Sequence, residues 1–145
     1  MTPDPAVKLG PRFLNHLIAD ADQIPYTLTV PLLYISGILD GQITVPAGFS
    51  TDLASIPQFL QNLIPKEGRY NRPAVVHDYL YGSQVFKGRM ITRKQADQVL
   101  LEAMRAAGVD WDRAQVIYLG VRIGGWIWWG KRAKELKAKQ AAAHV

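Results

Sequence analysis

Cysteine is absent from the sequence, and its absence removes several classes of function at once. A chain without thiols forms no disulfide, no iron–sulfur cluster, no cysteine nucleophile and no cysteine-based zinc site. Long hydrophobic runs are also missing: the most apolar stretch, residues 114–130, is shorter than the ~20 residues of a membrane span and contains Arg122. The first residues show neither the basic nor the apolar region of a secretory signal. We therefore expect no transmembrane segment, no signal peptide and a cytoplasmic start.

The body of the chain has almost no excess of charge. Residues 130–145 hold five basic residues and one acidic residue, whereas the rest holds 12 basic and 11 acidic ones. A nucleic-acid-binding protein spreads Lys and Arg over a folded face, so this distribution argues against a nucleic-acid partner. The length of 145 residues predicts one globular α+β domain over residues 1–130, with a loose N-terminal arm at 1–12. Residues 131–145 form a basic, Lys/Ala-rich C-terminal tail.

Strand signals come first along the chain and helix signals follow. Residues 26–30 alternate apolar side chains with Thr, and Asp40-Gly41 between two apolar runs suits a type I′ hairpin turn. Further on, Gly82 is expected to end one helix, and Thr92 with Gln95 matches a capping box that opens another. The predicted fold class is α+β, a small antiparallel β-sheet or hairpin packed against three to four α-helices. The predicted helices cover residues 57–65, 73–81, 93–107 and a stretch from Asp110, with a loop at 83–91.

An adjacent His-Asp pair, His77 and Asp78, lies on the helix predicted at residues 73–81. Neighbours on a helix diverge by about 100°, so the two side chains present two groups to one cleft instead of pairing with each other. His77 is a candidate general base on water, because histidine is the side chain whose ordinary pKa lies nearest neutrality. Tyr81 lies one turn beyond. The alternative is a histidine satisfied within the helix packing, with Asp78 bonded to a neighbouring loop.

The turn-rich loop at residues 45–57 is predicted to face this helix. Asp52 is a candidate to orient the His77 imidazole, while Ser55 and Thr51 are candidates for supporting the loop. Asp52 and Ser55 could instead cap the next helix or close Asx- and Ser-type turns, and this structural role is favoured for Ser55.

A divalent cation is a possible cofactor, and otherwise none is expected. Carboxylates with one imidazole favour Ca²⁺, Mg²⁺ or Mn²⁺ over zinc, with Asp78 and Asp52 as the first candidates for ligands. Asp97 lies at the edge of the apolar stripe of the next helix and faces a neighbouring element. The oxygen-rich set comprises His77, Asp78, Asp52 and Asp97.

The C-terminal Trp residues allow two interpretations. Trp126 and Trp129, three residues apart, could close the core. Alternatively, the apolar cluster beside five basic residues could make a peripheral contact with an anionic membrane surface.

Several motifs together resemble a small family of tailed bacteriophages and prophages that has no established activity. They are VPAGFSTDLASIP at residues 45–57, HDYLY at 77–81, Ala96-Asp97, and Tyr118 with Gly124 and Gly125. The resemblance covers residues 26–130. It implies a phage origin, a place in the host cytoplasm or the virion, and partners among phage structural proteins or the bacterial envelope.

A second, local resemblance is to phospholipase A2. His77-Asp78-x-x-Tyr81 followed by Asp97 on the next long helix is similar to the catalytic helix pair of that family. The resemblance implies that His77 activates water, Asp78 binds Ca²⁺, and Tyr81 with Asp97 holds His77.

Two hypotheses of different class follow. The first is a phage-encoded, metal-assisted hydrolase that acts on a lipid ester or a peptidoglycan bond of the bacterial envelope, with His77 as general base. The second is a non-catalytic protein of the virion, of assembly or of host interaction, in which the loop and the His-Asp helix form a structural lock. The sequence leaves open whether the protein is an enzyme.

Overall fold

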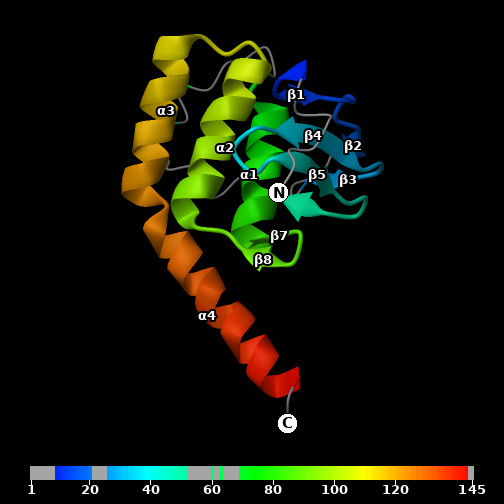
Figure 1. Cartoon of the computed structure of the whole chain (residues 1–145), viewed down its shortest axis with the longest axis vertical. Coiled ribbons are helices and arrows are strands. Elements are labelled where there is room, and N and C mark those ends of the chain that lie inside the picture. The colour runs from blue at the N-terminus through cyan, green and yellow to red at the C-terminus, as the bar shows by residue number, and fades with distance from the viewer. Residues whose placement is uncertain (1–8, 21–25, 52–59, 61–62, 64–68, 144–145) are drawn as a thin grey trace.

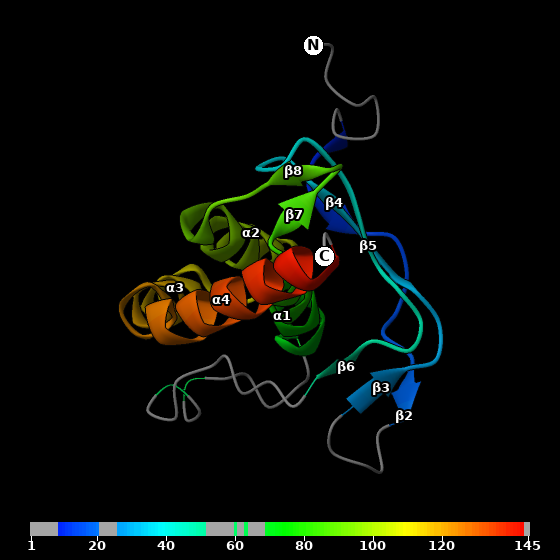
Figure 2. The ribbon, with the colours of Figure 1, turned by 90° about the horizontal axis from the view of Figure 1, so that it is seen from below.

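The computed structural model describes residues 9–20, 26–51, 60, 63 and 69–143, and these form an α+β fold (Figure 1). Small antiparallel sheets lie beside a layer of helices in which α2 packs between α1 and α3. The last helix, α4, leaves this body and carries the chain to its C-terminal end (Figures 1 and 2). The predicted fold class is confirmed.

The described elements are short strands and four longer helices. The helices are α1 (Asn71–Ser83), α2 (Arg93–Ala106), α3 (Trp111–Gly124) and α4 (Trp126–Ala143). One sheet has the order β1-β4-β5, a second has the order β2-β3-β6, and β7 pairs with β8. The strands are β1 (Arg12–Phe13), β2 (Ala19–Asp20), β3 (Tyr26–Leu28), β4 (Leu32–Ser36), β5 (Gly41–Val45), β6 (Ser50–Thr51), β7 (Val85–Phe86) and β8 (Arg89–Met90).

The predicted hairpin is present as β4 and β5, but its turn has four residues and ends at Asp40, in place of the two-residue turn expected at Asp40-Gly41. Ser36 pairs with Gly41, so residues 37–40 make the turn and Gly41 already belongs to β5. Asp40 carries the positive φ of 54°, which Asp tolerates better than most residues. Along β5 burial alternates, which places Ile43 and Val45 in the core against α1. The strand β1 begins at Arg12, the last residue of the segment predicted to be a loose arm, and pairs with β4.

The predicted end of α1 was wrong. The helix passes through Gly82 to Ser83 and ends at Gln84, whose backbone is left-handed with φ 55° and ψ 17°. The segment predicted as a loop over residues 83–91 contains the β7–β8 hairpin, turned by Lys87 at φ 50° and Gly88 at φ 76°. Most of the helix predicted at residues 57–65 lies outside the described residues.

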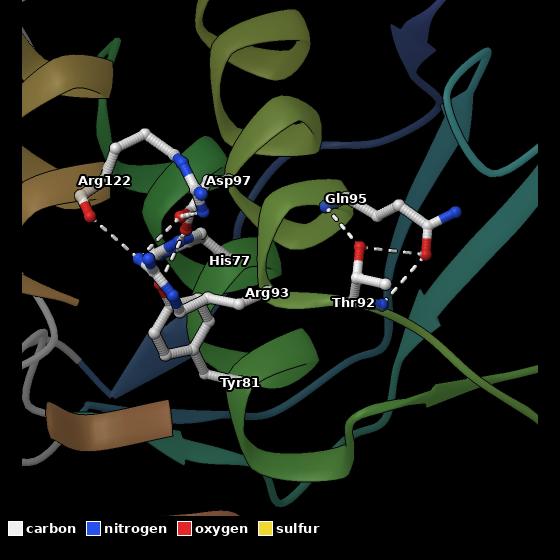
Figure 3. A network of polar contacts seen from close by, with 7 residues as sticks. All are labelled: His77, Tyr81, Thr92, Arg93, Gln95, Asp97 and Arg122. Atoms are coloured by element: carbon white, nitrogen blue, oxygen red, sulfur yellow. Dashed lines mark hydrogen bonds and ion pairs between the residues drawn. The ribbon is translucent and has the colours of Figure 1, made fainter. Parts of the chain in front are cut away.

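The capping box at the start of α2 is confirmed. The Thr92 hydroxyl accepts from the Gln95 backbone N–H at 3.1 Å, and the Gln95 side-chain oxygen accepts from the Thr92 N–H at 2.9 Å (Figure 3). After α2, Gly108 adopts a φ of 90° and turns the chain toward α3. The apolar stripe of α2 is buried against α1 and α3; its members are Ala96, Val99, Leu100, Ala103 and Met104.

The single helix expected after Asp110 is two helices that meet at Gly125. Asp110 holds the N-cap position of α3, although its side chain makes no capping hydrogen bond. Because α4 begins at Trp126, it crosses the predicted boundary between residues 130 and 131 without a break. Within the described part of the chain, no helix is long and apolar enough to cross a membrane.

Glu102 of α2 fastens the helices to the β4–β5 hairpin. Its Oε1 accepts from the Tyr34 hydroxyl at 2.7 Å and from the Ser36 hydroxyl at 2.9 Å. Its Oε2 accepts from the backbone N–H groups of Gly37 and Ile38, both at 3.0 Å. Burial, with the neighbouring Glu102 charge, raises the pKa of Tyr34, so the hydroxyl stays protonated and donates.

Replacing Glu102 with Gln should lower the free energy of unfolding by about 1–2 kcal/mol, because an amide turns an NH₂ group toward donors. For a chain of this size that is a fall in Tm of roughly 2–8 °C, measurable by circular dichroism. The matched change Asp40→Asn also neutralises a carboxylate, at a position where Asn tolerates the positive φ, and should shift stability by less than about 0.5 kcal/mol. Equal shifts in the two variants would contradict the fastening role.

Candidate functional site

The Asp97 carboxylate is the centre of a network between the helices (Figure 3). Its Oδ1 lies 2.8 Å from His77 Nε2 and accepts from the Tyr81 hydroxyl at 2.6 Å. His77 and Tyr81 both come from α1, where a separation of four residues places them on one face. The same spacing brings their rings together, with centroids 4.3 Å apart.

Two arginines complete the network on the other carboxylate oxygen. Arg122 of α3 donates to Asp97 Oδ2 at 2.8 Å, and Arg93, one turn before Asp97 on α2, lies at 3.3 Å. Arg93 also donates to the Arg122 backbone carbonyl at 3.0 Å. The carboxylate therefore joins side chains from α1, α2 and α3.

The Asp97 carboxylate and the His77 ring are buried, and the carboxylate is paired with two partly exposed arginines. Asp97 is 0% exposed and His77 1%. Burial alone would raise the pKa of the Asp97 carboxyl, but hydrogen bonds from His77 first, and then from Tyr81 and Arg122, outweigh it, and the net pKa is lowered. Burial, with the charge of Asp97, raises the pKa of the Tyr81 hydroxyl. At neutral pH Asp97 is therefore an ionised acceptor and Tyr81 a protonated donor.

This ionisation fixes the histidine tautomer. An ionised carboxylate only accepts, so the hydrogen between the two side chains is on His77 Nε2. In the neutral imidazole, Nδ1 then carries the lone pair. Nδ1 is buried and has no hydrogen-bond partner among the described residues. Asp97 thus orients the His77 ring through Nε2, while the basic nitrogen, Nδ1, makes no hydrogen bond to the described residues.

Gly125, which has no side chain, leaves room for the Tyr81 hydroxyl to reach Asp97. A Cβ built on Gly125 would overlap the Tyr81 hydroxyl oxygen and the Val121 carbonyl oxygen. On the other side, the Tyr81 ring packs edge-on against Trp129 of α4, with centroids 5.1 Å apart. Trp129 therefore borders the core, as one of the two interpretations predicted for it, whereas Trp126 is 62% exposed.

Of the other predicted site residues, Asp78 and Thr51 are described, and they bond to each other. Asp78 is half-buried and accepts a hydrogen bond from Thr51 of β6, which is the alternative in which it bonds a neighbouring loop. Asp52 and Ser55 lie outside the described residues. Within the described ranges, no group of three or more His, Asp or Glu side chains is arranged to hold a metal ion. The cation site predicted at Asp78 and Asp52 stays a prediction.

Arg93 and Arg122 were missed from the sequence. Arg93 precedes Asp97 by four residues on one helix, a spacing at which opposite charges interact, so the pattern was available. Arg122 stands alone in an apolar run of α3, and an isolated charge in such a run needs a partner. The isolated Arg122 thus indicates a buried contact as well as arguing against a membrane span.

The fold and the site together define an α+β protein with a buried carboxylate–histidine pair clamped by two arginines. The chain belongs to the family described as protein of unknown function DUF1353, whose model matches residues 26–121. The matched range begins where the sequence resemblance began and includes His77, Tyr81, Arg93 and Asp97. It stops one residue before Arg122 and does not reach α4. No curated protein and no solved structure matches the chain.

Proposed function

We propose that the protein is a phage-encoded hydrolase of the bacterial envelope in which His77 is the general base. The observation that carries the proposal is the orientation of the imidazole. His77 Nε2–H donates a hydrogen bond to Asp97, so the lone pair on Nδ1 is free to accept a proton. These contacts agree with the roles that the resemblance to phospholipase A2 implies for Tyr81 and Asp97. The phage origin rests on the resemblance of the loop and helix motifs.

In the proposed reaction His77 Nδ1 accepts a proton from water, and the resulting hydroxide attacks the carbonyl carbon of a lipid ester or of a peptidoglycan amide. The carbon–oxygen or carbon–nitrogen bond then breaks, and the leaving group takes the proton back from Nδ1. Asp97 stabilises the imidazolium while it exists, as the carboxylate does in a catalytic triad. A divalent cation held by Asp78 is a separate hypothesis.

The test uses a variant that separates the base from the packing. Gln in place of His77 can still donate an N–H to Asp97, but its amide is not a base. Replacing His77 with Gln should leave Tm within about 3 °C, the shift for less than 1 kcal/mol, and lower the hydrolysis rate by about 10²- to 10⁴-fold. Phospholipid vesicles and peptidoglycan sacculi are the two substrates, each assayed with Ca²⁺, Mg²⁺, Mn²⁺ or EDTA. The control is His16→Gln, because His16 is exposed and remote in the chain.

The second candidate is a structural lock in a non-catalytic phage protein, and the burial of the pair favours it. His77 is 1% exposed and Asp97 0%, and the bond between them joins α1 to α2, as expected of residues that hold two helices together. A parent protein with no hydrolytic activity on either substrate would reject the enzyme and leave the lock. Activity that survives His77→Gln would reject His77 as the base.

A further inference from the structure

An exposed apolar stripe runs along α3 and continues onto α4. Its residues are between 47% and 72% exposed. From Val116 to Ile123 they are three or four residues apart, and Trp126 and Ile127 lie three and four residues beyond Ile123, the spacing of one helix face. Between the two helices, Gly125 keeps a right-handed helical backbone with φ −76° and ψ −15°. The stripe consists of Val116, Leu119, Ile123, Trp126 and Ile127.

At its C-terminal end the stripe meets positive charge. A shallow hollow of about 410 Å³ on α4 is lined by Trp126, Ile127, Gly130, Lys131 and Lys134. The nearest acidic residue in the sequence, Glu135, does not line the hollow and is bonded to Arg132 at 3.0 Å. The Lys131 ammonium lies 5.7 Å from the Trp128 ring centroid. The hollow thus joins apolar walls to two ammonium groups.

These features select an anionic lipid surface over other occupants. In a symmetric dimer the patch meets the same patch of the second copy, which holds no acidic residue to pair with Lys131 and Lys134. A nucleic acid would satisfy the lysines but leave the aliphatic stripe in water. A lipid surface takes both, since apolar side chains enter below the headgroups and lysines meet the phosphates. Trp side chains are enriched at that depth.

We propose that the stripe and the two lysines form a peripheral docking face for an anionic membrane, with Val116, Leu119, Ile123, Trp126 and Ile127 directed into the lipid. This inference does not depend on the proposed hydrolase, because it concerns binding alone. In Figure 1 α4 projects from the body of the protein.

Cosedimentation of the full chain with vesicles tests the proposal. Vesicles of phosphatidylglycerol and phosphatidylcholine should bind the protein at low salt and release it at high salt, because salt screens the attraction. Pure phosphatidylcholine should bind much less. Tryptophan emission should move to shorter wavelength on binding, as Trp126 and Trp128 leave water.

Two double variants separate the charge from the stripe. Lys131→Gln with Lys134→Gln should weaken binding by roughly ten- to thirtyfold, the factor for two lysines at an anionic surface. Ile123→Ser with Ile127→Ser keeps every charge and should weaken binding at least about tenfold. The matched control, Arg89→Gln with Lys94→Gln, removes the same charge from exposed or half-exposed positions elsewhere and should bind nearly as the parent does.

Equal weakening by the control pair would mean a general attraction of positive charge and would overturn the docking face. The same holds if the parent does not bind anionic vesicles at low salt, or if the isoleucine pair binds normally. Sedimentation equilibrium covers the remaining case. A dimer that the isoleucine pair dissociates, without vesicle binding by the parent, assigns the stripe to a second copy of the chain.

Discussion

Replacing Asp97 with Asn should lower the free energy of unfolding by about 3 kcal/mol. Removing one partner of a buried ion pair typically costs about 3–5 kcal/mol, because the groups left behind keep an uncompensated charge. The lower end of the range applies here, since Arg93 and Arg122 are 20% and 28% exposed and can turn toward water. The expected fall in Tm is roughly 6–12 °C for a chain of this length, measured by thermal denaturation.

Acid titration provides the control for this variant. The pKa of Asp97 in the folded protein is lowered from its ordinary value of 3.8, so the carboxylate contributes stability in full well above that pH. The contribution is lost as the pH falls below about 3.8 toward the lower folded pKa. A plot of Tm against pH should therefore fall less steeply in acid for Asp97→Asn than for the parent. Parallel curves would show that Asp97 does not supply this stability.

Replacing Gly125 with Ala should destabilise the protein by about 1–3 kcal/mol, the usual cost of forcing extra volume into packed surroundings. The added methyl would overlap the Tyr81 hydroxyl oxygen, so Tyr81 must move away from Asp97. Since φ at Gly125 is −76°, Ala meets no φ penalty there, and the cost comes from the overlaps with the Tyr81 hydroxyl oxygen and the Val121 carbonyl oxygen. Chemical denaturation measures the loss, and tyrosine absorbance reports the changed surroundings of the ring.

Gly130 provides a control of opposite sign. It lies within α4, and a Cβ built there meets nothing within 4 Å. Ala at this position should stabilise the helix by up to about 1 kcal/mol, because Gly is the poorer helix former. If both variants destabilised the protein alike, the Tyr81 contact would not be the cause.

Residue patterns predicted most of the fold because those patterns report local physics. The β4–β5 hairpin and the capping box of α2 each follow from a few neighbouring residues. The end of α1 could not be predicted in the same way. Gly82 is the better residue for stopping a helix, yet Gln84 takes the left-handed position and its side-chain amide bonds to the Trp129 carbonyl at 3.0 Å. A tertiary contact overrides local preference there.

The candidate site was partly predictable for the same reason. His77 and Tyr81 share a helix face by their spacing, and the position of Asp97 at a stripe edge indicated a neighbouring element. Arg122 reaches the site only because α3 packs on α2, and no local pattern states which helices become neighbours. The loop residues Asp52 and Ser55 stay predictions.

Tyr81 is shared between the site and the helix that leaves the body. Its hydroxyl bonds Asp97, and its ring packs on Trp129 of α4, two residues before Lys131. Two further bonds fix α4 to the end of α1, from Gln84 to the Trp129 carbonyl and from Arg132 to the Gly82 carbonyl at 2.8 Å. The start of α4 and the Asp97 network therefore depend on the same tyrosine ring, so a change in how α4 packs on α1 also changes the surroundings of the Asp97 carboxylate.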